Sequence, residues 1–128
     1  YCCGPGPLMA GFATATAGLP AAQVHVEYFS NTVTASDTKA EAFEVICNRS
    51  GKTVQVPADR SILEVLEAEG LTPLCSCREG ICGTCETAVL AGEPDHRDLV
   101  LTADERASNA TMMICISRAK SASLTLDI

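Results

Sequence analysis

A chain of 128 residues is long enough for one domain of ordinary size and an appendage. Its net charge of -7, from sixteen acidic and nine basic side chains, argues against a nucleic-acid-binding protein, which needs a basic face. Eight cysteines in so short a chain suggest a disulfide scaffold, but a 47% apolar content can form a core without such bridges.

The first thirty residues contain no lysine or arginine. They predict a strand end and glycine turn in YCCGPGP, a small-residue helix in LMAGFATATAG and a strand in AQVHVEYF, which together make a piece of an α/β layer. No basic residue precedes the apolar stretch, as one would in a signal peptide, and the stretch is too short and too threonine-rich to span a membrane.

Residues 31–40 are rich in Ser, Thr and Ala without periodicity and predict a linker. A second unit follows over residues 41–128. It begins with EAFEVICNRSGKTVQV, which predicts a hairpin that turns at NRSG. DRSILEVLEAEG then predicts a helix, with Ser61 as its N-cap and Glu64 completing a capping box.

After a cysteine-rich loop, ETAVLAGEPD predicts a short strand and SLTLDI a final one. LTADERASN between them predicts a helical turn capped by Thr102 and Glu105. A hairpin, a helix, a loop and two further strands suggest a mixed sheet that clasps one helix. We therefore expect an α+β fold of the β-grasp type.

The spacing of four cysteines is the strongest signal in the sequence. Cys77, Cys82 and Cys85 lie in CREGICGTC as C-x4-C-x2-C, and Cys115 follows much later, which matches the plant-type 2Fe-2S pattern. Gly80 and Gly83 allow the loop to bend tightly around a cluster, and backbone N–H groups would then point at sulfur.

A structural zinc site is the alternative, because four thiolates also suit zinc. Zinc sites usually have two short cysteine pairs, whereas here three ligands share one loop. Cys47 is expected in the core and Cys75 beside the cluster without binding it. His25 and His96 lack a Cys-x-His pairing and are expected on a strand or the surface, so a Rieske-type site is disfavoured.

CREGICGTC with Cys115 resembles the plant-type ferredoxin module. GEPDHRDLVLTADER and CISRAKSASLTLDI resemble the C-terminal ferredoxin domain of the phthalate dioxygenase reductase and vanillate O-demethylase reductase group. The resemblance covers most of residues 41–128. In that group, modules for flavin, NAD and ferredoxin follow each other along the chain.

The N-terminal stretch is similar to the end of the NAD-binding domain in ferredoxin-NADP reductase-like enzymes. In YCCGP, the resemblance places Cys3, Gly4 and Pro5 near the nicotinamide, and in VHVEYF it makes Phe29 the aromatic that covers the flavin. Residues 1–30 would then be a C-terminal remnant of that domain. No flavin-binding barrel and no glycine-rich NAD loop are present in these 128 residues.

The resemblance implies an electron-transfer module of an NAD(P)H-dependent oxygenase reductase, with FMN or FAD as flavin. Electrons would pass singly from flavin through a 2Fe-2S cluster to a Rieske-type oxygenase, and the fragment alone would have no catalytic residues. Arg78 and Glu79 at the loop tip are expected to be solvated, or else to orient the oxygenase or flavin domain. A free-standing ferredoxin and a zinc-held interaction module remain the alternatives. We expect a cytoplasmic protein with neither nucleic-acid nor membrane partners.

Overall fold

The structure is a computed structural model that describes residues 1–31 and 41–128. The chain divides into two compact units, residues 1–32 and 33–128. The linker predicted over residues 31–40 lies, apart from its first residue, outside the described residues. Within the described ranges, no helix is both long and apolar enough to cross a membrane.

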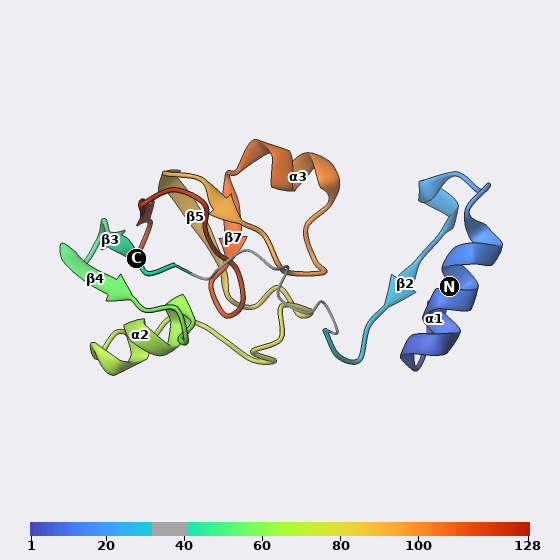
Figure 1. The fold of residues 1–128 in the computed structure, drawn as a ribbon, viewed down its shortest axis with the longest axis horizontal. Helices are drawn as coiled ribbons and strands as arrows, with labels where there is room; N and C mark the ends of the chain where they lie inside the picture. Colours follow the sequence, from blue (N-terminus) through green and yellow to red (C-terminus); the bar gives the residue numbers. More distant parts are fainter. Residues whose placement is uncertain (32–40) are drawn as a thin grey trace. The chain divides into compact units, whose positions relative to one another are not determined.

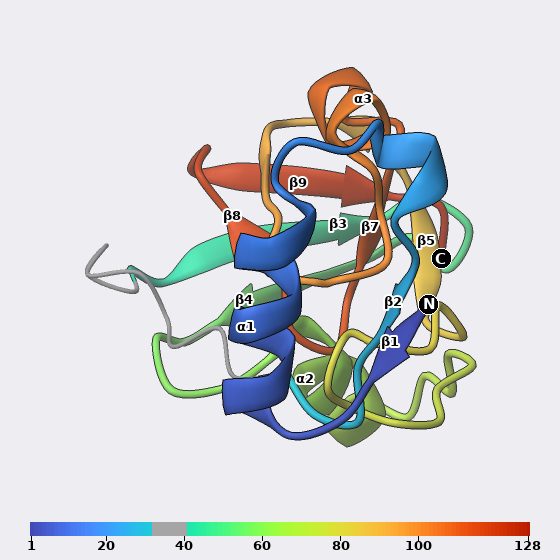
Figure 2. The same cartoon turned by 90° about the vertical axis from the view of Figure 1, so that its right-hand side faces the viewer.

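The N-terminal unit contains the predicted order of strand, helix and strand. Its elements are β1 (Cys2–Cys3), α1 (Gly6–Thr16), a 3-10 turn (Ala21–Gln23) and β2 (Val26–Glu27). β1 and β2 pair in parallel, and α1 lies beside them (Figure 2). The predicted second strand is shorter than expected, because Ala21–Gln23 turns instead of extending.

The C-terminal unit is built around a five-stranded sheet with strand order β4-β3-β9-β5-β7. Its strands are β3 (Phe43–Cys47), β4 (Lys52–Val56), β5 (Glu86–Ala91), β7 (Thr111–Met113) and β9 (Ser123–Leu126). β3 pairs antiparallel with β4 and parallel with β9, and β5 pairs antiparallel with β9 and β7. A separate short pair joins β6 (Pro94–Asp95) to β8 (Arg118–Ala119).

Two short helices begin at the capping boxes that the sequence predicts. They are α2 (Ile62–Ala68) and α3 (Ala103–Ser108). At α2, the Ser61 side chain accepts from the Glu64 N–H while the Glu64 carboxylate accepts from the Ser61 N–H. These bonds satisfy N–H groups that have no partner inside the helix. Figure 1 shows α2 beside the β3–β4 hairpin and α3 above β7.

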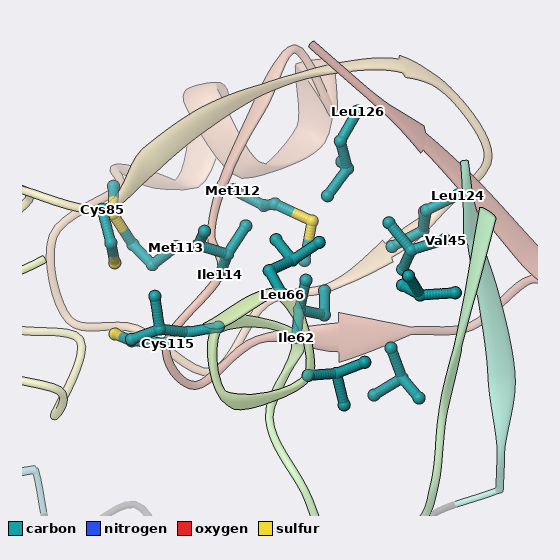
Figure 3. Close-up of a cluster of buried hydrophobic side chains, with 14 of the residues drawn as sticks. Val45, Ile62, Leu66, Cys85, Met112, Met113, Ile114, Cys115, Leu124 and Leu126 are labelled. Carbon is teal, nitrogen blue, oxygen red and sulfur yellow. The ribbon is translucent and has the colours of Figure 1, made fainter. Parts of the chain in front are cut away.

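The core lies between α2 and the sheet. Alternate residues of β3 are buried, and α2 contributes four buried side chains. Eight of the side chains labelled in Figure 3 are among the largest fully buried ones: Val45, Ile62, Leu66, Met112, Met113, Ile114, Leu124 and Leu126. This mixed sheet with one packed helix confirms the expected α+β class and the β-grasp arrangement.

Candidate metal centre

The loop between α2 and β5 is bent by left-handed backbone at three positions. Arg78, Gly80 and Gly83 have φ values of 59°, 68° and 77°. Residues other than glycine rarely adopt this conformation, and at Gly80 there is also no room for a side chain. A Cβ atom there would stand 2.6 Å from Cγ2 of Ile116 and 3.1 Å from Cα of Asp98. Glycine therefore lets the loop lie directly against two later segments of the chain.

The four candidate thiols lie in two pairs. Cys77 and Cys82 lie close enough within the loop for their thiols to interact. The thiol of Cys85, just before β5, interacts in the same way with that of Cys115, which follows β7. Cys85 and Cys115 are buried, whereas Cys82 is exposed. Figure 3 shows Cys85 and Cys115 together at one end of the core cluster, opposite the side chains of β3 and β9.

One thiol in each pair ionises more readily than an ordinary cysteine. The Thr84 hydroxyl, 3.3 Å from the Cys82 sulfur, lowers the pKa of Cys82 to about 6 with help from backbone hydrogen bonds. The hydrogen bond from Cys115 lowers the pKa of Cys85 to about 7, against the opposing effect of burial. The pKa of Cys115 is raised, because its proton is held by Cys85 and because it is buried. Since thiolates bind metals, Cys82 and Cys85 are the two thiols most ready to bind a metal near neutral pH.

Backbone N–H groups of the loop point at the sulfur atoms. The Glu79 N–H donates to Cys77 Sγ at 3.3 Å. A backbone hydrogen bond from Gly80 lowers the pKa of Cys115, although burial and Cys85 outweigh it. Hydrogen bonds of this kind stabilise negative charge on sulfur. The bent backbone thus directs partial positive charge toward the thiols.

Two further contacts hold the loop in place. The Arg78 guanidinium donates to both carboxylate oxygens of Glu67 on α2, at 3.1 and 2.6 Å. Both side chains are substantially exposed, so the ion pair orients the loop more than it stabilises the fold. The Leu99 N–H donates to the Gly80 carbonyl at 2.9 Å. The loop is therefore tied to α2 on one side and to residues 98–101 on the other.

This donor set fits a binuclear iron–sulfur group. Such a group needs four thiolates, two on each iron, and the thiols are arranged as two pairs. Among the described residues, no three His, Cys, Asp or Glu side chains converge on a point for a single metal ion. The close approach at Gly80 and the N–H groups directed at sulfur are the features that the sequence pattern predicts.

The other cysteines and histidines differ in position. Cys47 is buried on β3, as expected for a core residue. Cys75 is half-buried in the same loop, two residues before Cys77, and burial raises its pKa. His25 is exposed and stacks on Tyr1. The expectation of a strand or surface position is wrong for His96, whose side chain is only 7% exposed and lies in a loop.

The candidate nucleotide-site residues lie in the N-terminal unit. Gly4, Pro5 and Phe29 line a small cavity of about 150 Å³ together with Tyr28. Phe29 is 74% exposed, and Cys3, which is also exposed, does not line this cavity. Sequence reasoning missed Thr84 and Asp98 as neighbours of the loop, because their contacts come from hydroxyl orientation and long-range packing.

Comparisons with known proteins agree with this geometry. The family model described as 2Fe-2S iron-sulfur cluster binding domain matches residues 45–120. Phenoxybenzoate dioxygenase subunit beta of Ectopseudomonas oleovorans is 51% identical over 130 residues, which is 100% of this chain and 40% of that protein. This chain thus spans about 40% of the length of such curated relatives.

Two solved structures are similar as well. Phthalate dioxygenase reductase, described as a modular structure for electron transfer from pyridine nucleotides to 2Fe-2S, superposes with a TM-score of 0.80 at 44% identity, covering 100% of this chain and 39% of that one. The ferredoxin domain of NdmD, solved with NdmA from Pseudomonas putida CBB5, gives a TM-score of 0.65 at 32% identity, covering 69% of this chain and 100% of that one.

Proposed function

Because the chain belongs to the 2Fe-2S iron-sulfur cluster binding domain family, we propose that it is the electron-delivering end of an NAD(P)H-dependent oxygenase reductase. The observation that carries the proposal is the turn at Gly80, which packs directly against Ile116, the residue after Cys115, while the Glu79 N–H donates to Cys77 Sγ. The proposed ligands form two pairs, Cys77 with Cys82 and Cys85 with Cys115. Each pair would hold one iron of the cluster. Glu79 and Gly80 would direct their N–H groups at the bound sulfur atoms.

A bound 2Fe-2S cluster supplies one-electron transfer. Plant-type centres lie near about -400 mV and Rieske centres between about -150 and +300 mV, so delivery to a Rieske-type oxygenase is downhill by at least roughly 6 kcal/mol. The relatives support this acceptor class, because they include phenoxybenzoate and phthalate dioxygenase components. The protein's own task is to hold the ligands and to keep Cys85 and Cys115 away from water, while Cys82 stays at the surface.

The N-terminal unit is proposed to be the last part of an NAD-binding domain. Cys3, Gly4 and Pro5 would approach the nicotinamide, and the exposed ring of Phe29 would cover FMN or FAD in a longer protein. The linker over residues 31–40 and the ferredoxin domain over 41–128 complete the proposed organisation. Flavin and NAD modules would then be partners in the same chain, and the oxygenase a partner in trans. We also propose a cytoplasmic location, because the described cysteines are all free thiols.

The first experiment is spectroscopic. We expect the purified chain to be brown, with two irons per chain, visible bands that bleach on reduction and an EPR signal after one electron. A colourless protein with one zinc would contradict the proposal and favour the zinc-held module.

The second experiment tests whether the chain needs a separate flavoprotein to take electrons from NAD(P)H; the coding sequence upstream of residue 1 separates the reductase from a free-standing ferredoxin. Dithionite or an added reductase should bleach the bands, whereas NADH or NADPH alone should not, because residues 1–31 hold only one α-helix and two short strands of an NAD-binding layer. Bleaching by NADH without added flavoprotein would contradict this reading of the N-terminal unit.

A further inference from the structure

A buried carboxylate lies against the proposed metal-binding loop, residues 77–85. The side chain of Asp98 is fully buried, and its Oδ2 accepts hydrogen bonds from the Val100 and Leu101 N–H groups at 3.0 and 2.8 Å. The other oxygen, Oδ1, has no hydrogen-bond partner among the described residues. A buried carboxylate oxygen without a partner is unfavourable and calls for a donor.

The nearest candidate donor is the imidazole of His96. Its Nδ1 is buried, has no partner among the described residues either, and lies 3.9 Å from Asp98 Oδ1. This separation is about 1 Å longer than a hydrogen bond. The other ring nitrogen, Nε2, is already 3.1 Å from the side-chain oxygen of Asn109. The Asn109 amide can serve Nε2 as donor or acceptor by rotating, so a proton on Nδ1 leaves both ring nitrogens satisfied.

Asp98 is also part of the support of the loop. Its backbone lies against Gly80, and the next residue, Leu99, donates its N–H to the Gly80 carbonyl. The Gly80 N–H in turn is directed at Cys115. Any shift of residues 98–101 is therefore passed through one peptide unit to a proposed ligand.

We propose that His96 is a positioning residue for the metal-binding loop: its Nδ1–H donates to Asp98 Oδ1 and so locks residues 98–101 against Gly80. The importance of this lock for the cluster rests on the proposed function of the loop. Neither Arg106 nor Lys120 supplies a donor to Asp98 Oδ1. Arg106 lies 3.7 Å from Oδ2 and donates to the backbone carbonyls of Asp98 and Leu101, and Lys120 is paired with Glu93.

Two amide variants separate the ring nitrogens. In His96→Asn, the side-chain amide reaches the position of Nδ1 and keeps a donor for Asp98. In His96→Gln, it reaches the position of Nε2 and keeps only the contact with Asn109. Lys120→Gln, which breaks the exposed ion pair with Glu93 in a surface cavity that His96 also lines, is the matched control.

The measurements are hydrogen exchange of the Leu99 N–H, release of iron to a chelator, and the midpoint potential. For His96→Gln we expect roughly tenfold faster exchange and iron release, since one buried hydrogen bond is lost, and a shifted potential. His96→Asn and Lys120→Gln should stay close to the original protein. The proposal is overturned if hydrogen exchange and iron release in His96→Gln are the same as in the original protein. It is also overturned if they are slower in His96→Gln than in His96→Asn. Leu99 exchange needs no cluster, so it tests the lock even if the proposed function fails.

Discussion

The N-terminal and C-terminal units use their apolar residues in opposite ways. Helix α1 has eleven residues, among them Leu8, Met9 and Phe12, and none of them is buried. Helix α2 has only seven residues and buries four of them: Ile62, Leu63, Val65 and Leu66. Local hydrogen bonds are enough to shape a helix, but burial of one face supplies most of its stability. The length of a helix is therefore a poor guide to which unit is stable.

The proposed metal-binding loop is supported by the core of the C-terminal unit. Cys85 and Cys115 belong to the hydrophobic core cluster, whereas Cys77 and Cys82 lie in the irregular loop. Half of the proposed ligand set is thus positioned by packing and half by backbone turns and N–H groups. The N-terminal unit provides no comparable support, since no residue of 1–31 is buried.

The largest effect should come from the ligands. Replacing Cys77, Cys82, Cys85 or Cys115 by Ala should abolish the visible absorbance and destabilise the unit, because metal binding and folding are coupled. Cys75→Ser and Cys3→Ala are the controls and should keep the colour. Retained absorbance in Cys77→Ala would show that another thiol, such as Cys75, is the ligand.

The next largest effect contrasts helix α2 with helix α1. Leu66→Ala should reduce the free energy of unfolding by about 2–5 kcal/mol, because it empties a fully buried site. Leu8→Ala on α1 should change it by less than about 0.5 kcal/mol, because this side chain is 53% exposed. Chemical denaturation followed by far-UV circular dichroism measures both. Equal losses in the free energy of unfolding would mean that the N-terminal unit is packed as tightly as the C-terminal unit.

A smaller effect is expected at the helix caps. Ser61→Ala removes the side chain that accepts from the Glu64 N–H and should cost about 1 kcal/mol. Pro5, the residue that precedes α1, makes no side-chain cap, so Pro5→Ala is the comparison and should change the free energy of unfolding less. A neutral Ser61→Ala in the same denaturation experiment would contradict the role of the capping box.

Acid should weaken the same caps. Hydrogen bonds from Ser61 and Thr102 lower the pKa of Glu64 and Glu105 below the ordinary value of 4.5. Because the folded-state pKa is the lower one, this stabilisation is present above pH 4.5 and is lost as the pH falls through the folded value. Melting temperatures between pH 6 and pH 3 should drop less for Glu64→Gln than for the original chain. If the melting temperatures of the two proteins fell in parallel, other carboxylates would account for the loss of stability in acid.

The smallest effect should follow removal of residues 1–31. Since the whole buried core lies within residues 43–126, the remaining chain should keep its cluster, and its free energy of unfolding should stay within about 0.5 kcal/mol. Calorimetry of both forms tests this. A large loss would show that the N-terminal unit contributes packing to the ferredoxin domain.

Short-range patterns in the sequence were sufficient for several features. The hairpin of β3 and β4, the capping boxes at Ser61 and Thr102, and the loop with its left-handed glycines depend on residues within a few positions of one another. The cysteine spacing predicted the kind of metal group for the same reason, since three of the proposed ligands share one loop.

Only the tertiary structure decided the rest. β7 has three residues and becomes a strand by pairing with β5, and β6 and β8 have two residues each and exist only as a pair. The contact of Cys85 with Cys115, and the burial of Asp98 behind Gly80, join segments that are distant in the sequence. A local sequence pattern does not predict such contacts. They form only when the chain packs into its core, where buried polar groups need hydrogen-bond partners from other segments.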